Sequence, residues 1–188
     1  MSVAVLHKQG QVKVWVRDII ASFLASIIIS IAAPISLKLL FLPVAFTFQN
    51  NLVLFLAVLM GSKRGLMMVM FYLMQGVMGF PVFAGGGFGI VHLIGPSGGY
   101  LVGYLVAAYV SGHLAERCEE KSPIKLFQIM GIGNLIIYFF GVCYLSQFIG
   151  IKSAFLLGVL PFILGDLIKL IFFARIPVLK SVRMTRYF

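Results

Sequence analysis

The chain has 188 residues, of which 61% are hydrophobic and 11% are charged, and its mean hydropathy is +1.08. A soluble domain is about a quarter charged, and one water-soluble core of this size cannot hide so much apolar surface. The composition therefore excludes an ordinary soluble enzyme, a disordered chain and a small secreted scaffold. It predicts a single polytopic helical membrane domain.

The positive charge is distributed as in a membrane protein. The net charge is +10, from 15 Lys and Arg residues against 5 Asp and Glu residues. These basic residues lie between long apolar runs, as in membrane proteins. A nucleic-acid-binding surface would need a basic face interleaved with exposed aromatic residues, and the sequence shows no such pattern. Cys118 and Cys143 form no CxxC pair and no metal-ligand spacing, so we expect two free thiols. We expect no nucleic-acid partner, metal or cofactor.

Six apolar runs, separated by charged or Gly/Pro-rich segments, predict six transmembrane helices. Pro34 is expected to kink or stop the first of them. Their approximate bounds are 18–31 with an extension towards 40, 51–60, 66–78, 99–115, 126–148 and 154–174. The predicted organisation is a cytoplasmic N-terminal segment (1–17), an all-α six-helix domain (18–174) and a basic cytoplasmic tail (175–188).

The basic residues also predict the orientation in the membrane. Only Lys38 and Lys152 lie in the loops of one predicted side, and Lys169 lies within the last apolar run. Lys and Arg gather on the cytoplasmic side of membrane proteins, so both termini of this multi-pass protein are placed in the cytoplasm. Twelve of the 15 basic residues lie on that side: Lys8, Lys13, Arg17, Lys63, Arg64, Arg117, Lys121, Lys125, Arg175, Lys180, Arg183 and Arg186.

Two segments on the outward side are too apolar for simple solvated loops. They are residues 41–50 and the Gly/Pro-rich residues 80–96. Irregular backbone near a bilayer persists where it is buried in protein or lines a cavity. We therefore expect both segments to cover a site, with the glycines at 85–89 forming a lid.

One charged pair lies inside an apolar run. Asp166 is the only acidic residue within such a run, and Lys169, three residues later, falls on the same helix face. A charge at membrane depth costs about 2.5–3.5 kcal/mol on the insertion scale. Two interpretations stay open at this point. The pair is a structural ion pair with Lys169 snorkelling to the interface, or it faces a polar cavity and binds a ligand.

Uncharged polar residues cluster in the first outward segment. Thr47 and Gln49 are followed by Asn50 and Asn51, the densest such cluster in the apolar part of the chain. The two asparagines suit the N-terminal cap of the next helix. Thr47 and Gln49 are not needed for that cap, so a ligand-binding role is the alternative for them.

A serine motif raises the possibility of an enzyme. Residues 95–99 (GPSGG) match the G-x-S-x-G nucleophile signature and resemble the serine motif of rhomboid intramembrane proteases. Such a serine needs a base within hydrogen-bond reach, and His92 is the only plausible partner. We expect Ser97 instead to cap the following helix, and no enzymatic activity.

A stripe of small residues marks the first helix. Ala21 and Ala25 are four residues apart, and Ser22, Ser26 and Ser30 repeat beside them. Small residues at this spacing let another helix approach closely. The approaching helix is either one of this chain or one of a separate membrane subunit.

Four segments in the same order resemble BioY, the biotin-specific substrate-binding (S) component of energy-coupling factor (ECF) transporters. They are residues 43–50 (PVAFTFQN), 79–87 (GFPVFAGGG), 95–100 (GPSGGY) and 160–169 (LPFILGDLIK), and the resemblance covers about residues 15–180. It implies six helices in the bacterial inner membrane, an extracytoplasmic biotin pocket and no ATPase in this chain. It also implies docking of a transmembrane T subunit at Ala21 and Ala25, with separate ABC-type ATPase subunits supplying the energy.

The resemblance also implies which residues bind biotin: Asp166, Lys169, Gln49, Thr47, Gly86, Gly87 and Tyr100. The family often has Pro where this chain has Ala45, and some members have Asn near Gly87, so backbone groups of the loop would serve here. Biotin presents a ureido ring with two N–H donors and one carbonyl, a thioether ring and a carboxylate. An acceptor suits the N–H groups, a cation suits a negative charge, and apolar walls suit the rings. An S component for another vitamin is the alternative within the same class.

Overall fold

The computed structural model describes residues 2–34, 36–37, 46–119 and 122–176, and this part of the chain is almost entirely helical. The elements, in chain order, are α1 (Ser2–Ala32), β1 (Ser36–Leu37), β2 (Phe46–Thr47), α2 (Gln49–Met60), α3 (Ser62–Val77), the 3-10 turn η1 (Ala84–Gly86), α4 (Ile90–Ile94), α5 (Gly98–Arg117), α6 (Pro123–Ile149), α7 (Ile151–Gly158) and α8 (Leu160–Ala174).

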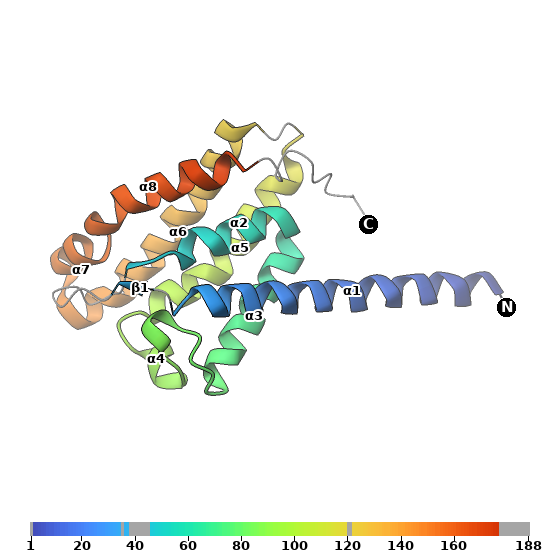
Figure 1. Cartoon of the computed structure of the whole chain (residues 1–188), viewed down its shortest axis with the longest axis horizontal. Coiled ribbons are helices and arrows are strands. Elements are labelled where there is room, and N and C mark those ends of the chain that lie inside the picture. Colours follow the sequence, from blue (N-terminus) through green and yellow to red (C-terminus); the bar gives the residue numbers. More distant parts are fainter. Residues whose placement is uncertain (1, 35, 38–45, 120–121, 177–188) are drawn as a thin grey trace.

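The helices pack as a bundle with α2 and α5 at its centre. Helix α5 packs against α2, α3 and α6, α1 lies along α3, and α8 lies along α6. The N-terminal part of α1 projects beyond the other helices (Figure 1). The two-residue strands β1 and β2 pair antiparallel, Ser36 with Thr47, at the end of the molecule away from that projection (Figure 1).

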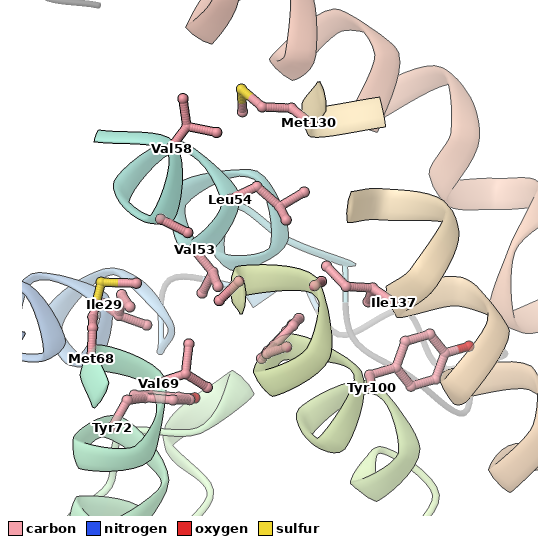
Figure 2. Packing of buried hydrophobic residues seen from close by; sticks show 14 of the residues in the cluster. Ile29, Val53, Leu54, Val58, Met68, Val69, Tyr72, Tyr100, Met130 and Ile137 are labelled. Atoms are coloured by element: carbon pink, nitrogen blue, oxygen red, sulfur yellow. The ribbon is translucent and has the colours of Figure 1, made fainter. Parts of the chain in front are cut away.

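The core lies where α1, α2, α3, α5 and α6 converge. Figure 2 shows Ile29 of α1 and Met68 of α3 on one side of α2, with Ile137 of α6 on the other. All three side chains are fully buried. Where α5 meets α6 only glycine fits: a Cβ on Gly99 would lie 2.5 Å from the carbonyl oxygen of Phe140. Small residues of this kind let two helices approach closely in a membrane, where no hydrophobic drive presses them together.

The outer surface of the bundle is apolar. Leu135, Leu164 and Ile168 are each more than two thirds exposed, a pattern typical of contact with lipid rather than water. Among the described residues, three helical segments are long and apolar enough to cross a membrane: Val14–Ala32, Pro123–Ile149 and Ile151–Ala174.

The predicted all-α fold is observed, but several predicted bounds differ. Helix α1 begins at Ser2, well before the predicted start of the first helix near residue 18. It ends at Ala32, before Pro34, rather than continuing towards 40. The last apolar run is two helices, α7 and α8, and the loop after α3 contains η1 and α4. Most of the predicted tail, residues 177–188, lies outside the described residues, as do residues 38–45.

Candidate substrate-binding site

A partly open pocket lies among the segments that join the helices. Its walls come from β2, from the first turns of α2 and α5, from η1 and α4, and from α6, α7 and α8. The lining residues are Thr47, Gln49, Asn50, Ala84, His92, Ser97, Tyr100, Leu101, Tyr104, Tyr138, Gly158 and Phe162.

A break between α7 and α8 shapes one wall. Val159 has φ −128° and ψ −57°, outside the helical region, and Pro161 follows in the first turn of α8. In a regular helix the backbone N–H of Phe162 would donate to the carbonyl of Gly158. Here it donates to the carbonyl of Val159, so the Gly158 carbonyl is left without its helical partner. The Tyr100 hydroxyl donates to that carbonyl oxygen at 2.8 Å. The break thus fixes Tyr100 against the pocket wall.

Behind the Tyr138 wall lies the predicted charge pair. Lys169 Nζ is 2.5 Å from Asp166 Oδ1, and the side chains of Lys169 and Asp166 are only 10% and 4% exposed. Lys169 Nζ also donates to the backbone carbonyl of Thr47 at 2.8 Å. Tyr138 donates to Asp166 Oδ2 at 2.5 Å. Buried charges persist only when they are paired and hydrogen-bonded in this way.

Two amides extend this network across the bundle. Asn51 Nδ2 donates to Asp166 Oδ1 at 3.0 Å, and Asn134 Nδ2 donates to Asn51 Oδ1 at 3.1 Å. The chain of bonds joins α2, α6 and α8 through residues that are all nearly inaccessible. The interpretation of Asn50 and Asn51 as helix caps is wrong, because α2 begins earlier, after Phe48, and both amides turn towards other helices.

Gln49 connects the pocket through hydrogen bonds to the loop that carries η1. Its amide nitrogen donates to the Tyr72 hydroxyl at 2.8 Å, and that hydroxyl donates to the carbonyl oxygen of Val82 at 3.1 Å. Gln49 is 1% exposed and lines the pocket. This relay joins α2 and α3 to the loop that carries η1.

The Gly-rich loop folds back on itself beside the pocket. Phe83 and Gly87 form an isolated antiparallel bridge, and His92 stacks on Phe83 with ring centroids 5.1 Å apart. A Cβ on Gly87 would lie 2.5 Å from His92 Nδ1, so a side chain at this position would require the His92 ring to shift. Gly86 has φ +75°, which favours glycine as well.

The geometry sorts the predicted binding residues into two groups. Thr47, Gln49 and Tyr100 line the pocket, as does Ala84 of the Gly-rich loop. Within the described part of the chain, the lining includes neither Gly86 and Gly87 nor the ion pair. Snorkelling of Lys169 is wrong, because its side chain is buried. Direct ligand contacts of all these residues stay a prediction.

The comparison with protein families decides what the chain is. The sequence model of the BioY family matches residues 5–185. The chain belongs to the BioY family. The resemblance drawn from the four sequence segments is therefore confirmed.

Curated BioY proteins and a solved structure match most of the chain. The biotin transporter BioY of Thermotoga maritima is 38% identical over 172 residues, which cover 90% of this chain and 99% of that protein. The biotin transporter BioY of Rhizobium etli is 33% identical over 163 residues, 81% of this chain and 87% of that protein. The crystal structure of the S-component for biotin from an ECF-type ABC transporter matches with a TM-score of 0.78 and 25% identity, over 92% of this chain and 94% of that chain.

Membership of the BioY family excludes the protease alternative. Ser97 and His92 both line the pocket, but the family is one of transporter S components, which are not enzymes and carry no cofactor. Ser97 stands at the cap position of α5 as predicted. Its hydroxyl makes no capping bond, and its backbone carbonyl accepts the N–H groups of Tyr100 and Leu101.

The small-residue stripe of this BioY chain serves internal packing in part. Ser22 Oγ donates to the carbonyl of Arg64 at 3.2 Å, and the Gln75 amide on α3 bonds both Ser26 and Ser30. Ala25 is 6% exposed, whereas Ala21 is partly exposed. Docking of a separate subunit at the two alanines stays a prediction.

Several residues of the site escape a reading of the sequence. Asn134 and Tyr138 lie in a long apolar run four residues apart, so they share one face of α6. A lone amide and a phenol on one face of a membrane helix indicate a buried polar contact. The spacing does not predict the hydrogen-bond partners of Asn134 and Tyr138, because these partners, Asn51 and Asp166, lie on α2 and α8.

Proposed function

We propose that this chain is the membrane-embedded biotin-binding subunit of an ECF-type transporter and mediates biotin uptake. The carrying observation is the structural match, over 92% of the chain, to an S-component for biotin. The curated relatives named as biotin transporters support the same conclusion. The pocket supplies a place for the vitamin, with tyrosine and apolar walls suited to a fused ring and a short chain.

Within this pocket, Thr47, Gln49 and Tyr100 contact biotin directly. Gln49 both donates and accepts, which suits either end of the ligand. Asp166 and Lys169 hold the walls from behind, because Asp166 already meets Asn51, Tyr138 and Lys169. Gly86 and Gly87 shape the lid through backbone geometry.

The chain crosses the cytoplasmic membrane six times, with both termini in the cytoplasm. The spans are formed by α1, α2, α3, α5, α6 and the broken pair α7–α8. The charge distribution of the sequence supports this orientation. The pocket then opens on the outer side, near β2 and α4, while the first turn of α3 carries Lys63 and Arg64 on the inner side.

Energy comes from partner subunits, a membrane T subunit and ABC-type ATPases. A tight site alone does not transport, because release inward requires a second state of weaker affinity. The exposed side of α1, with Ala21 between bulky apolar residues, is the docking surface for the T subunit. Substitution of Ala21 by Trp should spare biotin binding and lower uptake in cells that carry the partner subunits.

Equilibrium binding of labelled biotin to the detergent-purified chain tests the proposed function. We expect saturable binding that desthiobiotin displaces and thiamine does not. Absence of saturable binding would reject the proposed function. Displacement by thiamine as efficient as by biotin would favour an S component for another vitamin.

A further inference from the structure

Three tyrosine hydroxyls at the pocket have fixed hydrogen-bond acceptors in the protein. Tyr100 donates to the Gly158 carbonyl at 2.8 Å, and Tyr138 donates to Asp166 Oδ2 at 2.5 Å. Tyr104 donates to Asn50 Oδ1 at 2.5 Å. All three tyrosines line the pocket. Each phenol proton is therefore directed into the protein rather than into the cavity.

Two of these acceptors cannot reverse the bond. A backbone carbonyl and a carboxylate only accept, so the protons of Tyr100 and Tyr138 have one direction open to them. Gly158 keeps its carbonyl free because of the break between α7 and α8. Asp166 is held in place by Lys169. Rotation of either hydroxyl towards the pocket would leave a buried acceptor unpaired, which is costly.

These two phenol oxygens can still accept hydrogen bonds. A phenol oxygen that has given its proton to one partner still offers lone pairs to another. In Tyr104 part of this capacity is used, because the Thr47 hydroxyl hydrogen-bonds it. Tyr100 and Tyr138, one from α5 and one from α6, thus give the pocket two acceptors.

We propose that Tyr100 and Tyr138 determine ligand specificity by accepting hydrogen bonds from two N–H donors of a cyclic urea. This inference rests on the proposed function, because the ureido ring of biotin carries two such donors. In a ligand with an oxygen in place of either N–H, the lone pairs of that oxygen would face the lone pairs of a tyrosine oxygen and repel them. Tyr100 and Tyr138 reject it because their protons are already committed.

A ligand series on the unmodified chain gives the first test. Titration calorimetry in detergent compares biotin with oxybiotin, in which the ring sulfur is oxygen and both N–H groups remain. It also includes the two cyclic carbamates in which one ureido N–H is replaced by oxygen. Oxybiotin should bind within about threefold of biotin, and each carbamate roughly tenfold or more weakly. Carbamates that bind as tightly as biotin would overturn the proposal.

The variants Tyr100→Phe and Tyr138→Phe assign the two acceptors. Each should weaken biotin binding by roughly three- to tenfold. The ratio of biotin to carbamate affinity should fall towards one for the carbamate altered at the matching nitrogen. A purely structural role would not move this ratio.

Tyr144→Phe is the matched control. Tyr144 lies on α6 and also donates to a backbone carbonyl, that of Ile94 at 3.0 Å, but it is not among the residues that line the pocket. It should keep the affinity and the ratio of the unmodified chain. If biotin binds and both pocket variants keep the unmodified ratio, the inference is rejected while the proposed function stands. If biotin does not bind the unmodified chain, both are rejected.

Discussion

Two carboxylate–cation pairs of similar geometry occupy opposite environments in this molecule. Asp166 and Lys169 meet at 2.5 Å with side chains 4% and 10% exposed. Asp18 and Arg64 meet at 2.7 Å, between α1 and α3, with side chains 23% and 32% exposed. The first pair lies at the centre of a network that reaches three helices and β2. The second lies at the start of α3, next to the turn between α2 and α3.

The difference between the pairs lies in what each carboxylate holds. Asp166 accepts from Asn51 and Tyr138 besides Lys169, so its removal would release several elements at once. The Asp18–Arg64 pair stands beside a helix contact that other groups make, such as the bond from Ser22 to the backbone of Arg64. Similar distances therefore do not imply similar contributions to stability.

The largest expected effect follows from removing Lys169. In Lys169→Met the Asp166 carboxylate remains buried without its cation, which typically costs about 3–5 kcal/mol. Thermal unfolding of the detergent-purified variant measures this loss. The double variant Asp166→Leu with Lys169→Met should recover only the part of this loss that comes from the unpaired charge, because Asn51 and Tyr138 then lose their acceptor.

Lys152→Met is the control for that measurement. Lys152 is an exposed lysine of α7, and its loss should change the unfolding temperature little. Equal destabilisation by Lys152→Met and Lys169→Met would contradict the assigned importance of the buried pair.

The sequence predicted the contact within the buried pair but not its other partners. The i, i+3 spacing of Asp166 and Lys169 in an apolar run predicted their contact, and the structure confirms it. Their other partners were not predictable, because Asn51 lies 115 residues from Asp166 in the chain. Hydropathy and periodicity describe one helix at a time, whereas this network depends on how α2, α6 and α8 are oriented.

The positions of the helices were also predicted only in part. The apolar runs located the helices, since burial in lipid requires continuous apolar sequence. They missed the N-terminal extension of α1, because hydropathy detects the part of a helix suited to the bilayer and not the whole helix. They also missed the division of the last run at Val159, although Pro161 is typical of a first helical turn.

The contact between α5 and the turn that joins α2 to α3 depends on a glycine. A Cβ on Gly112 of α5 would lie 2.6 Å from backbone atoms of Gly61 and Ser62. Backbone cannot yield as a side chain does, so Gly112→Ala should cost about 1–3 kcal/mol in thermal unfolding. The control is Gly131→Ala in α6, where no atom lies within 4 Å and alanine should be neutral or stabilising by up to about 1 kcal/mol.

An unchanged stability of Gly112→Ala would mean that α5 moves freely against this turn. That outcome would also question the bonds from the backbone N–H and hydroxyl of Ser62 to Glu116 Oε1, at 2.7 and 3.1 Å. Those bonds complete the N-terminus of α3 with a side chain from another helix, and they require α5 to stay close.

The smallest effect is expected from the partly exposed Asp18–Arg64 pair. Arg64→Ala should lower the free energy of unfolding by about 1 kcal/mol or less, because partly exposed ion pairs gain little over their hydration. The carbonyl of residue 64 still accepts from Ser22, so the contact between α1 and α3 persists. Raising the salt concentration should shrink the difference between Arg64→Ala and the unmodified chain. A salt-independent loss as large as that of Lys169→Met would show that this helix end is as dry as the centre of the bundle, and the contrast between the two pairs would then fail.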